Sequence, residues 1–106
     1  MSRALISIPA SVSAGEIFEV KVLIAHPMET GFRTGASGRI LERDIITDFS
    51  CLFENEEVFR AQFSPAIAAN PFISFSMRVK KPGTFRFQWR GDHGFEADEE
   101  RQVELK

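Results

Sequence analysis

The 106-residue sequence contains one cysteine and no tyrosine, and both shortages limit what the chain can be. A single cysteine cannot form an internal disulfide, so cysteine content does not indicate the redox compartment. Without tyrosine the chain also lacks the tyrosine corner of antibody domains. No apolar run approaches the ~20 residues that a membrane-spanning helix needs. The segment "ALISIPA" is too short and too interrupted for a signal peptide, which by itself predicts a cytoplasmic protein.

Charge and length exclude further classes. The chain has 13 basic and 15 acidic residues, a net charge of -2, which gives no reason to expect a nucleic-acid partner. Its length predicts a single domain over residues 1–106 with one core. Eleven phenylalanines can build that core, because each fully buried ring contributes roughly 1.5–3 kcal/mol.

Seven segments alternate apolar and polar residues with the period of a β-strand. The clearest is "TFRFQWR", with Phe85, Phe87 and Trp89 on one face. The seven segments are residues 3–8, 16–26, 45–54, 57–63, 71–80, 84–90 and 95–105. With turn residues between them, they predict an immunoglobulin-like antiparallel β-sandwich that has no disulfide. Only "SPAIAAN" (64–70) predicts a helical turn, capped by Ser64.

Metal-binding side chains are few. A blue-copper centre needs two histidines, a cysteine and usually a methionine. The chain barely supplies them, with His26, His93, Cys51 and the methionines Met1, Met28 and Met77. Cys51 has no neighbouring histidine and lies mid-strand on the inward face, which favours a buried core thiol. His93 in the turn "GDHG" fits an exposed turn residue, and His26 fits a hydrogen-bonded structural histidine.

Catalytic motifs are not recognisable. Neither histidine stands in a frame with a nucleophile and an orienting group. The glycines at 31, 35 and 38 do not form a phosphate loop, because no Lys-Ser/Thr follows and no helix opens behind them. The acidic residues of 95–105 alternate along a solvated edge, which disfavours a calcium site. We therefore expect no enzyme, no metal and no cofactor.

The connection over residues 27–44 is the most informative segment. At 18 residues it is longer than ordinary loops in a compact domain, and such loops are usually functional. "GASG" (35–38) predicts the tip of a β-hairpin that extends from the sandwich. Its charges are of both signs, which suits a protein partner.

Apolar residues also fall on the outward parity of two strands: Ile17 and Leu23 on one, Ile46 and Leu52 on another. Single exposed apolar residues are normal. If these four share one sheet they form a patch, and a patch indicates a permanent partner.

Three blocks together resemble the SoxZ family, subunits of the sulfur-oxidation carrier complex SoxYZ. They are "HPMETGFRTGASGRILERDIITDFSC", "NEEVFRAQFSPAIAANPFISFSMRV" and "PGTFRFQWRGDHG". The similarity runs from about Ile6 to Leu105, with the blocks in order and at fitting spacing throughout.

The resemblance implies a function that the residues alone do not supply. SoxZ pairs with SoxY, whose C-terminal Gly-Gly-Cys-Gly-Gly arm carries sulfur covalently to successive periplasmic enzymes. This sequence ends "RQVELK", so the carrier cysteine is not expected here, and Cys51 on the core face is not expected to replace it. The implied role is a non-catalytic partner and docking subunit. The implied location is the periplasm, by co-export with SoxY, which carries a twin-arginine signal.

On this interpretation the hairpin is a recognition element for SoxY or for the visiting enzymes. The candidate partner-binding residues are His26, Met28, Glu29, Thr30 and Arg33. The alternative is that "HPM" only shapes the end of a strand, with Pro27 stopping the ladder. Two other functions stay open: a free-standing Ig-like adhesion or ligand-binding domain, and a metalloprotein that uses His26, His93 and Met28.

Overall fold

The computed structural model describes residues 4–106 of the chain. These residues contain eight strands and one short 3-10 helix, joined by loops. The elements are β1 (Ala4–Ser7), β2 (Ser11–Val12), β3 (Phe18–Ile24), β4 (Ile46–Phe53), β5 (Glu56–Gln62), β6 (Phe72–Met77), β7 (Gly83–Gly91), η1 (Asp92–Gly94) and β8 (Glu96–Leu105). These residues contain no helix with the length and hydrophobicity that crossing a membrane requires.

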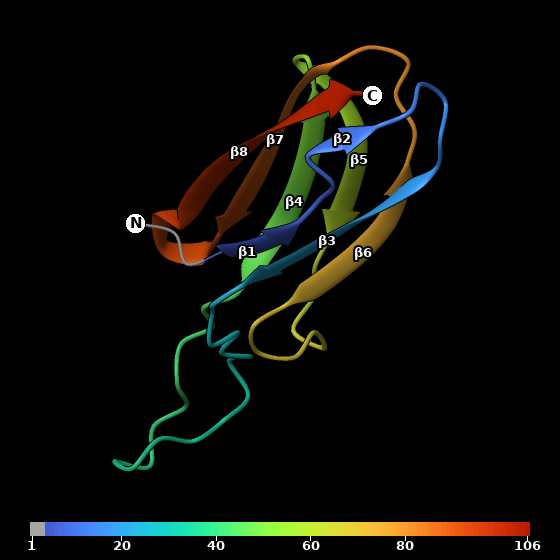
Figure 1. The fold of residues 1–106 in the computed structure, drawn as a ribbon. Coiled ribbons are helices and arrows are strands. Elements are labelled where there is room, and N and C mark those ends of the chain that lie inside the picture. The colour runs from blue at the N-terminus through green and yellow to red at the C-terminus, as the bar shows by residue number, and fades with distance from the viewer. Residues whose placement is uncertain (1–3) are drawn as a thin grey trace.

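The strands form two sheets that lie face to face (Figure 1). One has three strands in the order β1-β3-β6, and the other has five in the order β2-β8-β7-β4-β5. All pairings are antiparallel except the short parallel pair of β2 with β8. Cys51 is buried and forms no disulfide. This confirms the predicted all-β, immunoglobulin-like sandwich without a disulfide.

The seven predicted strands correspond to β1 and β3 to β8, with ends that differ by at most three residues. Arg3, at the start of the first predicted strand, lies outside the described residues. Strand β2 was not predicted, because two residues show no period; it forms where Ser11 and Val12 pair with the end of β8.

The predicted helical turn over residues 64–70 is wrong in type. Ser64 does cap a turn, accepting the Ala66 N–H at its Oγ (3.3 Å) and the Ile67 N–H at its carbonyl (3.0 Å). The turn does not continue into a helix, and Asn70, in a left-handed conformation (φ 53°) directly before Pro71, ends the segment. The exposed side chains of residues 66–70 also give a helix no packing face.

The core is centred on Phe49, which is fully buried in β4. Its ring lies 5.2 Å from Trp89 and 6.2–6.5 Å from Phe59, Phe75 and Phe87, measured between ring centroids. Phe59 of β5 also stacks on Phe75 of β6 at 4.2 Å, which joins the two sheets along one side of the sandwich. Aromatic packing therefore supplies the connection between sheets that a disulfide supplies in antibody domains.

A bulge at the start of β4 changes which residues face the core. The register shifts between Ile46 and Asp48, so Ile46 and Phe49 are both fully buried. The prediction that Ile46 points outward is therefore wrong. The bulge also brings β4 close to Gly91, where an added Cβ would lie 2.5 Å from the Ile45 carbonyl oxygen.

Replacing Phe49 by alanine should destabilise the fold by about 3–5 kcal/mol, because it leaves a cavity between the two sheets. The matched control is Phe32→Ala, which removes the same ring from a side chain that is 81 % exposed. It should change the free energy of unfolding by no more than about 0.5 kcal/mol. Urea unfolding of both variants measures the difference, and equal losses would contradict the core described here.

Candidate partner-binding hairpin

Residues 27–44, called the hairpin from here on, leave the sandwich after β3 and return to β4 (Figure 1). At the base, Glu29 and Asp44 exchange backbone hydrogen bonds of 2.9 and 2.8 Å. Near the tip, Thr34 pairs with Ile40, and the Gly35 N–H donates to the Arg39 carbonyl at 2.7 Å. The segment projects beyond the ends of the strands, in a molecule 58 Å long and about 20 Å across. The predicted extended hairpin with its tip at 35–38 is thus confirmed.

His26 and Met28 are buried at the hairpin base, 6 % and 4 % exposed. His26 Nδ1 accepts the Met28 N–H at 2.9 Å, and Met28 Sδ accepts the Ile46 N–H at 3.2 Å. Met28 has a left-handed backbone (φ 52°), which costs of order 1–3 kcal/mol for a residue with a side chain. These bonds hold the chain in the bend from which the hairpin leaves. In this structure both side chains shape the hairpin base; a contact between either and a partner stays a prediction.

Asn70 anchors the 64–70 turn to the same bend. Its side-chain oxygen accepts the His26 N–H at 2.9 Å, and its own N–H donates to the His26 carbonyl at 2.8 Å. The sequence placed Asn70 only at the end of the predicted helical turn over 64–70 and did not indicate this role. A hydrogen bond between residues 44 positions apart leaves no local pattern to find.

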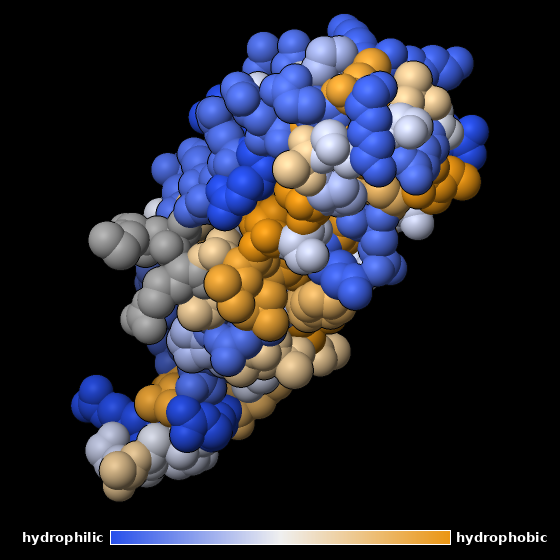
Figure 2. Space-filling model, in the orientation of Figure 1, coloured by the Kyte–Doolittle hydropathy of each residue, from blue (hydrophilic) through white to orange (hydrophobic). Residues whose placement is uncertain are grey.

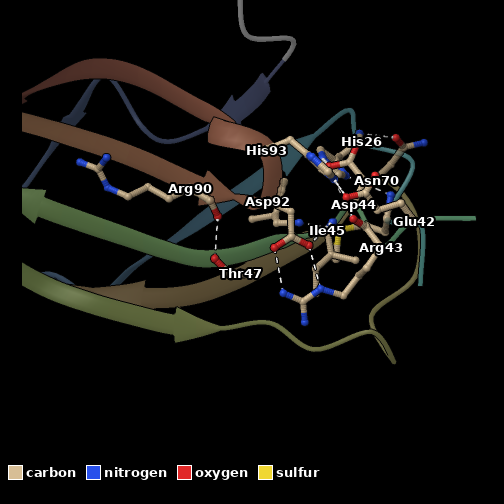
Figure 3. Close-up of polar contacts among 12 residues, drawn as sticks. His26, Glu42, Arg43, Asp44, Ile45, Thr47, Asn70, Arg90, Asp92 and His93 are labelled. Carbon is tan, nitrogen blue, oxygen red and sulfur yellow. Dashed lines mark hydrogen bonds and ion pairs between the residues drawn. The ribbon is translucent and has the colours of Figure 1, made fainter. Parts of the chain in front are cut away.

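A second anchor comes from the turn between β7 and β8 (Figure 3). Arg43 donates two hydrogen bonds of 2.8 Å to the Asp92 carboxylate, which also accepts the Ile45 N–H at 3.1 Å. His93 is exposed, as predicted, and its Nε2 lies 2.9 Å from the Arg43 carbonyl oxygen. The Phe95 ring packs edge-on against His26 at 4.9 Å between centroids. The hairpin is therefore fixed at its base on two sides.

Farther out, the hairpin carries an ion pair and exposed apolar side chains. Arg33 Nη2 lies 2.6 Å from Glu29 Oε1, and Thr30 Oγ accepts the Phe32 N–H at 3.1 Å. Phe32 is 81 % exposed and Ile40 is 70 % exposed. Sequence reasoning found Glu29, Thr30 and Arg33 but missed the two apolar residues. Exposed apolar groups beside charged ones are typical of protein-binding surfaces.

The side chains considered as metal ligands are engaged or separated. His26 Nδ1, Met28 Sδ and His93 Nε2 each have a hydrogen-bond partner in the chain. Within residues 4–106, no three or more His, Cys, Asp or Glu side chains group closely enough to hold a metal ion. Cys51 is fully buried, which confirms the predicted core thiol, and burial raises its pKa to about 12.

The match to a family model shows to which protein family the chain belongs. The family model for the sulphur oxidation protein SoxZ matches residues 6–102. The chain belongs to the SoxZ family. The resemblance described from the three sequence blocks is therefore confirmed. The SoxZ family is a non-catalytic subunit of the SoxYZ carrier complex, so the chain is not an enzyme but a sulfur-oxidation protein related to SoxYZ.

Solved structures show how widely the fold occurs. The SoxZ-family chain matches SoxY, a sulfur carrier protein from Chlorobium limicola f thiosulfatophilum, at 17 % identity and a TM-score of 0.69, over 97 % of this chain and 78 % of that one. It matches a superoxide reductase (neelaredoxin) from Ignicoccus hospitalis at 18 % identity and a TM-score of 0.73, over 99 % and 82 %. At such identities the likeness concerns the fold alone. No curated protein sequence matches the chain.

Cys51 should not react with a thiol reagent while the protein is folded, because it is buried and its raised pKa keeps it protonated. We expect no labelling by iodoacetamide at pH 8 over hours, and complete labelling of one thiol in 6 M guanidinium chloride. Intact-mass measurement distinguishes the two states. Rapid labelling of the folded protein would show that Cys51 is accessible.

The two histidines should titrate on opposite sides of 6.5. Burial lowers the pKa of His26, and protonating its Nδ1 would also break the bond from the Met28 N–H. The hydrogen bond to the Arg43 carbonyl and the nearby Glu42 carboxylate raise the pKa of His93. NMR titration of the two imidazoles, assigned with His93→Gln, measures both. A His26 midpoint above that of His93 would contradict the described base.

The two shifts affect stability in opposite directions. Below 6.5 the unfolded chain binds a proton at His26 more readily than the folded chain does, so the contribution of His26 is complete above 6.5 and is lost as the pH falls. The contribution of His93 is present below 6.5 and is lost as the pH rises through its raised pKa.

Proposed function

We propose that the chain is the non-catalytic subunit of a SoxYZ-type heterodimer. It binds a SoxY-like subunit and presents that subunit's C-terminal cysteine arm, which carries covalent sulfur during thiosulfate oxidation. The family match over residues 6–102 carries this proposal. The buried thiol of Cys51 agrees with it, because a carrier cysteine has to be exposed on a mobile segment.

The hairpin is proposed as the recognition element for the SoxY-like subunit or for the enzymes that visit the arm. Its base is held by His26, Met28 and the Arg43–Asp92 pair. Because the base is already ordered, binding a partner costs little further conformational entropy there. Thr30 and Arg33 lie beyond that base, and Arg33 pairs with Glu29 at the base. Arg33 is the most exposed charge of the ion pair, with 67 % of its side chain accessible.

The proposed location is the periplasm, reached by co-export with the SoxY-like subunit. The family relationship is what supports this location. Cell fractionation with and without the partner gene tests this: the chain should move to the periplasm only when the partner is co-expressed.

Co-expression with a SoxY-like subunit should yield a one-to-one heterodimer, observed by native mass spectrometry. A chain that stays monomeric with that subunit present would favour a free-standing Ig-like domain instead.

Within the complex, Arg33→Ala should lower the affinity for the SoxY-like subunit, or the rate of sulfur turnover, about fivefold, as expected for about 1 kcal/mol. The matched control is Arg60→Ala on β5, which also removes an exposed arginine paired with a nearby glutamate, Glu57 at 3.0 Å. Arg60→Ala should change neither quantity. Equal effects of both variants, or none from Arg33→Ala, would remove the hairpin from the proposed recognition surface.

A further inference from the structure

The outer faces of the two sheets differ in character. On the five-stranded sheet, cross-strand neighbours are charged: Arg86 lies opposite Glu100, and Arg90 lies opposite Glu96 with an ion pair between them. Such charged rows remain in water in a folded monomer. This face gives no indication of a permanent partner.

On the three-stranded sheet, a row of apolar side chains crosses all three strands. Leu5 of β1 lies opposite Leu23 of β3, and Leu23 lies opposite Phe72 of β6. Leu5 is 72 % exposed and Phe72 is 58 % exposed. The three side chains line a recess of about 300 Å³, and the surface over β1 and β3 is apolar in Figure 2. We call Leu5, Leu23 and Phe72 the apolar row.

The charged residues beside the apolar row already have partners within the sheet. Glu19 accepts a hydrogen bond from Ser74 at 3.0 Å and lies 3.3 Å from the Lys21 ammonium. Burying a paired charge costs less than burying an unpaired one. The face can therefore lose its water without leaving an isolated charge behind.

The apolar row lies at the end of the sheet from which the hairpin departs. Leu23 is in β3, which ends two residues before His26, and Phe72 follows Asn70, whose N–H donates to the His26 carbonyl. A partner that covers the row is thus beside the hairpin base. The two features together can form one continuous surface.

The area of the three-stranded face limits how a partner can cover it. Three strands about 4.8 Å apart, up to seven residues long with a rise of about 3.3 Å per residue, give this face an area of roughly 300 Å². A stable interface buries about 800 Å² on each side. The sheet face alone is too small, so its occupant has to extend onto neighbouring elements such as the hairpin.

We propose that the apolar row is the buried centre of the interface with the SoxY-like subunit, which lays an apolar sheet face over it and reaches the hairpin base. This inference rests on the proposed heterodimer and adds where the subunit binds. SoxY has a similar sandwich fold, with a TM-score of 0.69, so it also has sheet faces, and two such faces can pack against each other. A second copy of this chain is the competing occupant.

The first test replaces single residues of the row and measures binding of the purified SoxY-like subunit. Leu5→Glu and Phe72→Glu should each weaken binding at least tenfold, because a charge would be buried at the centre of the contact. The matched control is Leu52→Glu, an apolar residue on the outward parity of β4, which should bind within threefold of the unchanged chain. Circular dichroism and urea unfolding check that each variant is folded.

The second test does not depend on a destabilising change. Since Cys51 is buried, Leu5→Cys gives the chain one accessible thiol. In the complex, its labelling by a bulky maleimide should slow at least tenfold, while Gln102→Cys on the exposed outer face of β8 should label at the same rate with or without the partner. Peptide mass mapping separates these labels from the arm cysteine of the partner.

The outcomes separate the two proposals. If the unchanged chain binds no SoxY-like subunit, the heterodimer itself is wrong. If it binds, but Leu5→Cys stays fully reactive in the complex and Leu5→Glu binds normally, the apolar row is not the interface. If the chain alone forms a dimer that Leu5→Glu dissociates, while binding of the SoxY-like subunit is unchanged, the row pairs two copies of this chain and the inference is overturned.

Discussion

The arrangement of the hairpin end of the molecule depends on one neutral histidine. His26 accepts the Met28 N–H, packs against the Phe95 ring and holds Asn70 through its backbone. It therefore joins the end of β3, the hairpin, the 64–70 turn and the β7–β8 turn. Apart from the end of β3, these segments are loops that have few other contacts to fix one conformation. Because the imidazole is buried, its uncharged form is favoured, and that form provides the acceptor that Met28 needs.

Alternation of apolar residues was enough to predict the sandwich, because each long strand has one face in the core. The alternation did not predict the places where strand pairing is irregular. The bulge after Ile46 reverses the inward parity, and nothing in the local sequence marks the extra residue. Strand β2 exists only because its two residues reach the end of β8. The residues in 64–70 have local signals for a helix, but a single turn with no packing surface does not propagate.

The candidate site was predicted only in part, because its local features are visible in the sequence and its long-range contacts are not. The length of the connection, its glycines and its mixed charges indicated a hairpin, and "HPM" indicated a special strand end. The partners that fix the base, Asn70 and Asp92, lie 44 and 49 positions from the residues that they bind. Such pairings depend on how the loops converge in space. The apolar row was missed for the same kind of reason. Of the outward apolar residues considered, only Leu23 belongs to it. Leu5 and Phe72 lie beside Leu23 because of how β1 and β6 pair with β3.

The structure divides its surfaces by chemistry in a way that suits a carrier complex. One outer face is charged and stays in water, the opposite face has an apolar row, and the hairpin next to that row has a rigid base and an exposed outer part. In the proposed heterodimer, a subunit beside a partner that carries sulfur on a cysteine also has to avoid thiol exchange with it. Thiolates are the attacking species in such exchange, so a buried cysteine with a pKa of about 12 is doubly protected. With a single cysteine the chain also has no internal sulfur–sulfur bond for such a thiol to attack, and aromatic packing joins the sheets without one.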